Sequence, residues 1–260
     1  MRKRGMVERA PPLSAEDVAY VRSLLIREEP GLLAFNKPSG LPVQTRNPDD
    51  RTLDMLLRAF EKSNGKRPRL VHRLDAQTSG VIIAARTQPA AAALSGAFAK
   101  RQVQKTYLAI VAGHLGDETS GVISAPLARY RARPELELMR VARPGDEKPQ
   151  EAQTSWRELA RAGSRRLLEV RPRTGRMHQI RIHLASIGQP ILGDVYYGGE
   201  ASLGGDAVPR LMLHAWSLSG PHPEDGRFKL TAPPPPDFRD TAQAAGDALG
   251  AALANLAEPE

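Results

Sequence analysis

The sequence predicts an α+β fold, because many strand-like runs are interrupted by only a few helix-like stretches. Apolar and β-branched runs bounded by Gly, Pro and polar residues recur along the chain, as at 31–35, 81–85, 103–111 and 167–170. Apolar residues at helical spacing mark the segments 53–60 and 180–187, and 88–99 is rich in alanine. The chain has 260 residues, which is enough to bury a large core.

The charge balance and the absence of cysteine narrow the classes of protein. The 37 Lys and Arg residues against 29 Asp and Glu give a net charge of +8, which indicates a polyanionic partner such as nucleic acid. The alternative is a merely basic surface, which charge alone does not exclude. With no cysteine, disulfides, thiolate catalysis and Cys-ligated zinc are excluded. No apolar stretch is long enough to span a membrane, and no apolar region follows the basic start at 1–5. We therefore expect a soluble, cytoplasmic protein that is not membrane-bound.

The first third of the chain begins with an extension, residues 1–29, in which Ser14 caps a helix predicted to reach Ile26. The segment 31–43 is a buried strand that runs into a Pro/Gly turn, and this turn fixes Lys37 at the strand end. Considered alone, Lys37 is a solvated surface lysine. Thr52 is predicted to cap an amphipathic helix that ends near residue 62.

The segment Arg69–Ala85 reads as strand, polar loop and strand, with Gly80 supplying a sharp bend. Its loop presents Asp75 between Arg73 and the pair Thr78-Ser79, so charge partners and hydrogen-bond donors lie close to the carboxylate. Such an acid suits the role of nucleophile or base. The alternative is an ordinary Asx-turn. An aspartic-protease loop is excluded, because two residues intervene before the Thr-Ser-Gly and no second copy exists.

Two further elements follow. The segment 88–99 is predicted to be a helix, and the cluster Lys100-Arg101-Gln102 at its end either complements the helix dipole or contacts phosphate. A strand then runs from Val103 to Gly113 and contains Tyr107, which would ordinarily be a core residue. Residues 114–151 contain a loop, a basic run at 129–133 and a polar hairpin through Pro144-Gly145-Asp146. The basic run is either a solvated face or a phosphate contact.

The stretch 167–194 reads as a strand, a Gly turn and a helix closed by Gly188 and Pro190. On this helix Arg181 shares a face with Met177, His178 and Ala185, so its guanidinium is expected to turn inward and to need a carboxylate partner. Asp75 is the candidate. His178 and His183 lie about 140° apart around a helix and cannot chelate one metal ion. No phosphate-binding or dinucleotide motif is present, so neither a metal nor a cofactor is implied.

The last part of the chain contains a strand at 209–218, a turn, and a proline run at 233–236 that closes the main domain, predicted at 30–240. Residues 241–260 are rich in alanine and weakly helical, and we expect them to form a peripheral tail.

Three stretches together resemble the RluA-type pseudouridine synthases. They are Asn36-Lys37-Pro38-Ser39-Gly40-Leu41-Pro42-Val43, His72-Arg73-Leu74-Asp75-x-x-Thr78-Ser79-Gly80, and Thr174-Gly175-Arg176-x-His178-Gln179-Ile180-Arg181-Ile182-His183-Leu184 with a following Gly188-x-Pro190-Ile191-Leu192-Gly193-Asp194. The resemblance covers residues 31–238 and implies one catalytic domain built on a mixed, largely antiparallel sheet flanked by helices, without an evident accessory S4 domain. One departure is Met177, where the family usually has Thr or Ser; Thr174 is expected to supply the missing hydroxyl cap.

The resemblance implies that the protein isomerises specific uridines in structured RNA, ribosomal or transfer, to pseudouridine. The base is flipped out of its stack, the bond from C1′ to N1 is broken, and the uracil rejoins through C5. Asp75 would be the catalytic carboxylate, either as nucleophile or as the base that removes a sugar proton. Arg181 would hold Asp75 ionised, and Tyr107 would stack on the base and assist loss of the C5 proton.

Further residues are implied to bind the substrate. Leu213 would form an apolar floor under the base, although a plain core leucine is an equal reading. Arg73 would contact phosphate or fill the space left by the flipped base, Lys37 would be an active-site wall, and His72 and Thr78 belong to the same loop. The partner is RNA, with no obligatory protein partner evident. The competing hypothesis is a catalytically silent RNA-binding protein on the same scaffold, and a metal-dependent nuclease is a distant third.

Overall fold

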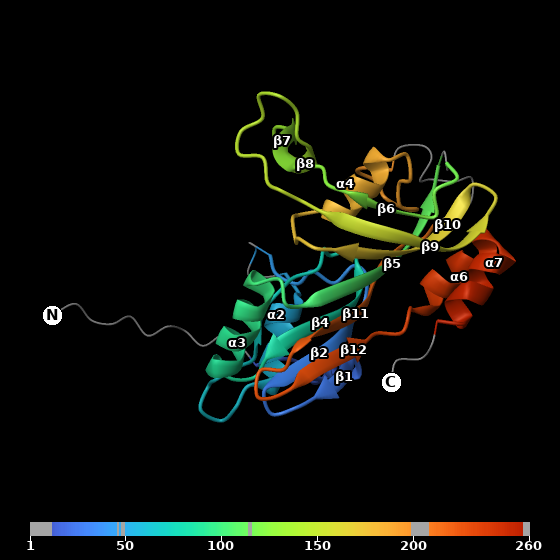
Figure 1. Ribbon diagram of the computed structural model, residues 1–260. Helices are drawn as coiled ribbons and strands as arrows, with labels where there is room; N and C mark the ends of the chain where they lie inside the picture. The colour runs from blue at the N-terminus through green and yellow to red at the C-terminus, as the bar shows by residue number, and fades with distance from the viewer. Residues whose placement is uncertain (1–11, 46, 48–49, 114–115, 199–207, 257–260) are drawn as a thin grey trace.

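The computed structural model describes residues 12–45, 47, 50–113, 116–198 and 208–256, and it confirms the α+β class. Its described strands form one ten-stranded sheet and a separate two-stranded hairpin (Figure 1). The main path runs β1 (Leu25–Glu28), β2 (Leu32–Lys37), β4 (Ser79–Ala85), β11 (Leu213–Pro221), β5 (Gln104–Ala112), β10 (Arg165–Pro172), β9 (Thr154–Ala162) and β6 (Ser120–Ile123). Beside this path, β12 (Arg227–Thr231) pairs with β11 and β3 (Arg69–Leu70) pairs with β4. Of the described pairings only β4 with β11 is parallel, so the sheet is mixed and largely antiparallel.

The helices of the first half begin where the capping residues predict. Ser14 accepts from Asp17 N at the start of α1 (Ala15–Ser23), and Thr52 accepts from Met55 N at the start of α2 (Leu53–Leu56), which continues as the 3-10 turn η1 (Leu57–Phe60). The helix α1 ends three residues before the predicted Ile26, because the following residues pair with β2 as strand β1. The alanine-rich helix α3 spans Gln88–Ala99 as predicted.

The second half carries α4 (Gln179–Ser186), α6 (Pro236–Ala245) and α7 (Asp247–Ala254). The last two lie beside β9 and β10, at the end of the molecule away from α3 (Figure 1). Leu249 and Leu253 are buried in the core of this half together with Phe238 of α6. The described residues of the predicted tail, up to 256, are helical as expected, but they bury one apolar face against the sheet and are not peripheral.

The sheet has a hydrophobic cluster on each side of its centre, and the two meet at Tyr107 of β5. Between them β4 and β11 approach closely at Gly80, whose φ is +113°. A Cβ atom on Gly80 would lie 2.1 Å from the carbonyl oxygen of Ala215, so no larger residue fits there. The predicted bend is thus also the contact that joins the two halves directly after the Asp75 loop.

The basic run 129–133 lies in a two-stranded hairpin of β7 (Leu127–Arg133) and β8 (Leu136–Val141), which turns between Arg133 and Leu136 and not at the predicted Pro144-Gly145-Asp146. The hairpin projects from the body above α4 (Figure 1), and Leu127 and Met139 pack with Ile182 of that helix in a small third cluster. Within the described ranges, no helix has the length and apolar character needed to cross a membrane.

Candidate active site

A cavity of about 690 Å³ opens at the centre of the sheet, where β4, β5 and β11 meet the start of α4. Its wall is formed by the predicted residues Asp75, Tyr107, Arg181, Arg73, Leu213, His72 and Thr78, among others. Lys37 does not line it. In the described lining, Asp75 is the only acidic residue, and it is accompanied by six Lys and Arg side chains: Arg73, Arg101, Lys105, Arg173, Arg176 and Arg181.

The Asp75 loop is held by its main chain. Thr78 N donates to the Asp75 carbonyl at 3.0 Å and closes the turn between main-chain atoms, so the carboxylate is left to face α4. The side chain of Asp75 is 30% exposed. The polar loop is therefore a tight turn, but it is not an Asx-turn closed by the carboxylate.

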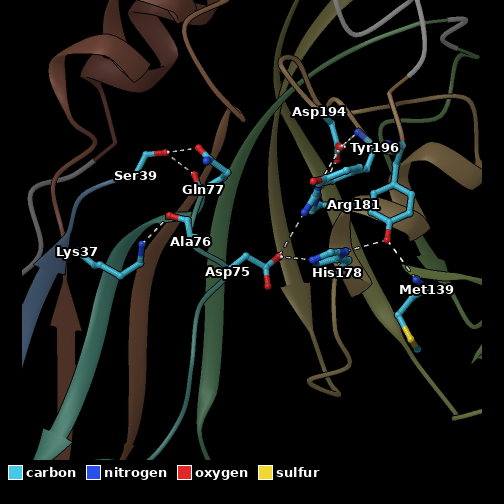
Figure 2. Close-up of polar contacts among 11 residues, drawn as sticks. Lys37, Ser39, Asp75, Ala76, Gln77, Met139, His178, Arg181, Asp194 and Tyr196 are labelled. Atoms are coloured by element: carbon cyan, nitrogen blue, oxygen red, sulfur yellow. Dashed lines mark hydrogen bonds and ion pairs between the residues drawn. The ribbon is translucent and has the colours of Figure 1, made fainter. Parts of the chain in front are cut away.

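Lys37 supports this loop from behind. Its Nζ donates to three carbonyl oxygens, those of Pro38 at 2.9 Å, Leu41 at 2.9 Å and Ala76 at 3.0 Å. Figure 2 shows the bond to Ala76. The side chain is fully buried, so the reading of Lys37 as a solvated surface lysine was wrong. Burial lowers the pKa of Lys37 to about 7, against the opposing charge of Asp75. Because Ala76 follows the carboxylate directly, Lys37 fixes the position of Asp75 without touching the cavity.

His72 and Thr78 serve the same loop. His72 Nε2 accepts from Ile83 N at 3.0 Å, and the ring stacks on Phe98 of α3 with a centroid distance of 4.6 Å. Burial lowers the pKa of His72 to about 3, which keeps the ring neutral and able to accept. Thr78 is almost fully buried, whereas Arg73 is exposed at the cavity mouth.

Arg181 is buried and lies between two carboxylates. It makes a bidentate pair with Asp194, Nε to Oδ2 at 2.8 Å and Nη2 to Oδ1 at 2.7 Å, while its Nη1 lies 3.8 Å from Asp75 Oδ2 (Figure 2). Burial lowers the pKa of Arg181, but the hydrogen bond to Asp194 and the charge of Asp194 together raise this pKa above its ordinary value. The predicted contact with Asp75 is present, but Asp194 is the principal partner.

His178 is the second cation candidate next to the carboxylate, and sequence reasoning gave it no role. Its Nε2 lies 4.0 Å from Asp75 Oδ2, and its Nδ1 lies 2.8 Å from the Tyr197 hydroxyl, which accepts from Met139 N at 3.4 Å (Figure 2). Burial lowers the pKa of His178, while the charge of Asp75 raises it. A contact therefore runs from the β7–β8 hairpin through Tyr197 and His178 to Asp75.

The start of α4 differs from the prediction for Thr174. The cap position is His178, in a left-handed conformation with φ of +55° and without a side-chain cap. Thr174 instead donates to Gln179 Oε1 at 2.7 Å, and that oxygen also accepts from Arg176 N at 3.1 Å. The Gln179 amide, not a hydroxyl, thus satisfies the donors at this turn, and its Nε2 donates to Gln153 O at 2.9 Å.

Tyr107 and Leu213 form the apolar side of the cavity from neighbouring strands. Leu213 is aligned with Ala109 and Ala215 with Tyr107 in the β11–β5 ladder. Leu213 is 3% exposed and Tyr107 is half-buried. Burial raises the pKa of Tyr107 above its usual range, and the charge of Asp75 adds to this effect. The phenol is therefore protonated at neutral pH.

The family is decided by comparison with known proteins. The profile of the family described as RNA pseudouridylate synthase matches residues 31–186. This chain belongs to that family. An RNA pseudouridine synthase of Zymomonas mobilis is 36% identical over 209 residues, which cover 80% of this chain and 92% of the relative. The ribosomal large subunit pseudouridine synthase D of Nitrosomonas europaea is 38% identical over 221 residues, 82% of this chain and 62% of the relative, so this chain spans less than two thirds of that protein.

Solved structures agree with this assignment. The structure of human RNA pseudouridylate synthase domain containing 4 superposes with a TM-score of 0.72 and 26% identity, covering 88% of this chain and 97% of that one. As a member of the RNA pseudouridylate synthase family, the protein is an isomerase of the class that forms pseudouridine in RNA.

Proposed function

We propose that the protein isomerises specific uridines in structured ribosomal or transfer RNA, with Asp75 as its catalytic carboxylate. One observation carries the proposal: a carboxylate, a buried guanidinium, a phenol and an apolar floor, from Asp75, Arg181, Tyr107 and Leu213, converge on one cavity of about 690 Å³. A cavity of this size and mixed lining suits a nucleobase that has been flipped out of its stack. The net charge of +8 favours a polyanionic substrate.

Asp75 can serve two routes from the same position. In the direct route, its oxygen attacks C1′ as the C1′–N1 bond breaks and the electron pair stays on the uracil; C5 then attacks C1′, displaces the carboxylate and loses its proton, while N1 gains one. In the glycal route, Asp75 removes the C2′ proton as the same bond breaks, and returns it when C5 attacks C1′; C5 then loses its proton and N1 gains one, as in the direct route. Deuterium at C2′ separates the routes, because only the glycal route breaks that C–H bond. Every atom of the product comes from the uridine, so no cofactor is required.

The surroundings of Asp75 suit a carboxylate that must remain reactive. Arg181 Nη1 is 3.8 Å away, beyond a hydrogen bond, because the bidentate pair with Asp194 holds the guanidinium back. The cation thus lies beside the carboxylate without covering the oxygen that reacts. Lys37, through the Ala76 carbonyl, fixes the loop from the opposite side.

Tyr107 would enter the reaction as a phenol. Its raised pKa means that no phenolate is present beforehand, so the hydroxyl can relay the C5 proton only while it gives up its own. Its ring and Leu213 would hold the uracil while it turns. Arg73 at the cavity mouth would contact phosphate or fill the place of the flipped base.

The test is pseudouridine formation on RNA from cells that lack the protein, with sites mapped by carbodiimide-dependent reverse-transcription stops. Wild type should restore stops at defined uridines and so identify the RNA. Asp75→Asn keeps the shape of the side chain and removes its charge; it should restore none while still binding the RNA. Appreciable turnover by Asp75→Asn would refute the role of Asp75. If neither protein restores a stop on RNA that both bind, the protein is a silent RNA-binding member of the family.

A further inference from the structure

The end of helix α3 has an arginine where the backbone favours glycine. Gln102 N donates to Ala97 O at 2.9 Å and Arg101 N donates to Phe98 O at 3.0 Å, the two bonds of a Schellman motif. Arg101 occupies the left-handed position of this motif, with φ of +57°. Residues with a Cβ atom are strained in this conformation, which is why glycine usually occurs there.

Contacts within the protein do not explain why an arginine occupies this left-handed position. Arg101 is exposed, and in the part of the chain that the structure describes its side chain makes no hydrogen bond or ion pair. A cation near a helix C-terminus does interact favourably with the helix dipole, but Lys100 already provides one. Strain at an exposed residue without partners indicates a function outside the fold.

The location of Arg101 indicates what that function is. Arg101 lines the mouth of the cavity together with Arg73 from the Asp75 loop and Arg173 from the turn before α4. All three side chains are exposed, whereas Lys105 and Arg176 are anchored to the carbonyls of Thr174 and Glu151. Exposed arginines on separate elements around one opening suit a chain of phosphates that crosses it.

We propose that Arg101 binds a backbone phosphate of the RNA strand beside the flipped uridine, with Arg173 across the cavity mouth. This inference rests on the proposed function and adds the contact that positions the strand. A phosphate contact of this kind is made in the ground state and the transition state alike, so its loss raises KM and leaves kcat unchanged.

Two substitutions of Arg101 separate charge from backbone strain. Arg101→Gly removes both, and it should raise the melting temperature by about 2–4 °C while RNA binding weakens. Arg101→Gln keeps the strain and removes the charge, so it should weaken binding equally at an unchanged melting temperature. If the arginine serves the helix dipole instead, Arg101→Gln lowers the melting temperature and leaves binding unaltered, which would overturn the proposal.

Lys148→Gly is the matched control. Lys148 is also exposed and left-handed, with φ of +50°, and it lies outside the cavity lining. The variant Lys148→Gly should therefore show the same gain in melting temperature as Arg101→Gly. It also loses one positive charge, but it keeps the proposed phosphate contact of Arg101.

Binding is measured with single-stranded oligouridylate over a range of salt concentrations. One lost phosphate contact lowers the slope of log affinity against log salt by about 0.7. A fourfold rise in salt concentration should thus reduce the RNA affinity of the wild type about 2.6-fold more than that of either Arg101 variant, and Lys148→Gly should behave like wild type. Wild-type slopes for the Arg101 variants, or an equal change in Lys148→Gly, would overturn the proposal.

The assay for pseudouridine on cellular RNA keeps the two proposals apart. If the wild type forms pseudouridine and the Arg101 variants keep its salt slope and KM, only the phosphate contact is refuted. If the slope changes as expected but no pseudouridine forms, the contact stands and the proposed activity does not.

Discussion

Replacement of Asp194 by asparagine tests the ion pair that holds Arg181. Asp194 is 1% exposed and Arg181 5%, and two hydrogen bonds of 2.8 and 2.7 Å join them. Asp194 Oδ1 also accepts from the main-chain nitrogens of Tyr196 and Tyr197, at 3.0 and 3.1 Å. Asp194→Asn keeps the shape of this side chain but leaves the buried guanidinium with Asp75, 3.8 Å away, as its nearest described carboxylate.

The expected cost in stability is large for a substitution that keeps the shape of the side chain. Breaking a buried pair by removing one charge destabilises a protein by about 3–5 kcal/mol, which lowers the melting temperature of a chain of this size by roughly 6–20 °C. The pH dependence gives a second signature. The hydrogen bond and charge of Arg181 hold the pKa of Asp194 below its ordinary value despite burial, so its contribution is present above about pH 3.9 and is lost as pH falls through the lower, folded-state pKa. Asp194→Asn should lack this acid-dependent loss.

Urea unfolding of four proteins provides the assay: wild type, Asp194→Asn, Arg181→Met and the double variant. Each single variant leaves one partner unsatisfied, whereas the double variant removes both charges, so it should be no less stable than the worse single variant. Arg181→Met should also lose activity, because Asp75 would lose its neighbouring cation. A cost below about 1 kcal/mol for Asp194→Asn, as for exposed pairs, would refute the reasoning.

Three further changes address the remaining parts of the site. Tyr107→Phe keeps the ring contact and should lower single-turnover rates without weakening RNA binding; unchanged turnover would remove the hydroxyl from the mechanism. Gly80→Ala should cost about 2–4 kcal/mol, because its Cβ would meet the Ala215 carbonyl at 2.1 Å, whereas Gly96→Ala in helix α3, with open space around its Cβ, should stabilise the protein slightly; equal effects in urea unfolding would contradict the close approach. Burial lowers the pKa of His214 to about 4, so the folded state excludes a proton that the unfolded state binds, and stability should fall by about 1.4 kcal/mol per pH unit from pH 6.5 down to 4. His214→Gln should reduce the slope by this amount and leave the contribution of His72, and an unchanged slope would show that His214 is not one of its sources.

The sequence predicted most elements, because their signals are local. The caps at Ser14 and Thr52, the helix at 88–99 and the strand around Tyr107 all lie where hydrogen-bonding residues, apolar spacing and β-propensity placed them. The end of α1 was missed, because the pairing of β1 with β2 is decided by residues outside the helix.

The residues of the site were less predictable than the elements that carry them. Helical spacing correctly predicted that the Arg181 side chain points inward, but it does not reveal which of the two carboxylates lies closer to the guanidinium. The position of Asp194 at the end of the same motif was the one available sign of this second partner. Nor does any pattern in the sequence indicate the left-handed backbone of His178, which aims its ring at Asp75. Both depend on a turn whose shape comes from tertiary contacts of Gln179.

The parallel contact of β4 with β11 also sets the order in which the active site can form. Ser79 Oγ lies 2.9 Å from His214 Nδ1, a partner 135 positions later in the chain. Strands β1 to β4 can pair as soon as they leave the ribosome, and β5 can pair with β10, but among the described strands only β11 joins these two units into one sheet, and it is synthesised after them. Contacts of such long separation are slow to form, and the unpaired edges of β4 and β5 stay open meanwhile. Catalytic competence should therefore appear late in synthesis and abruptly, with a nascent chain that stops before β11 having folded parts but no cavity.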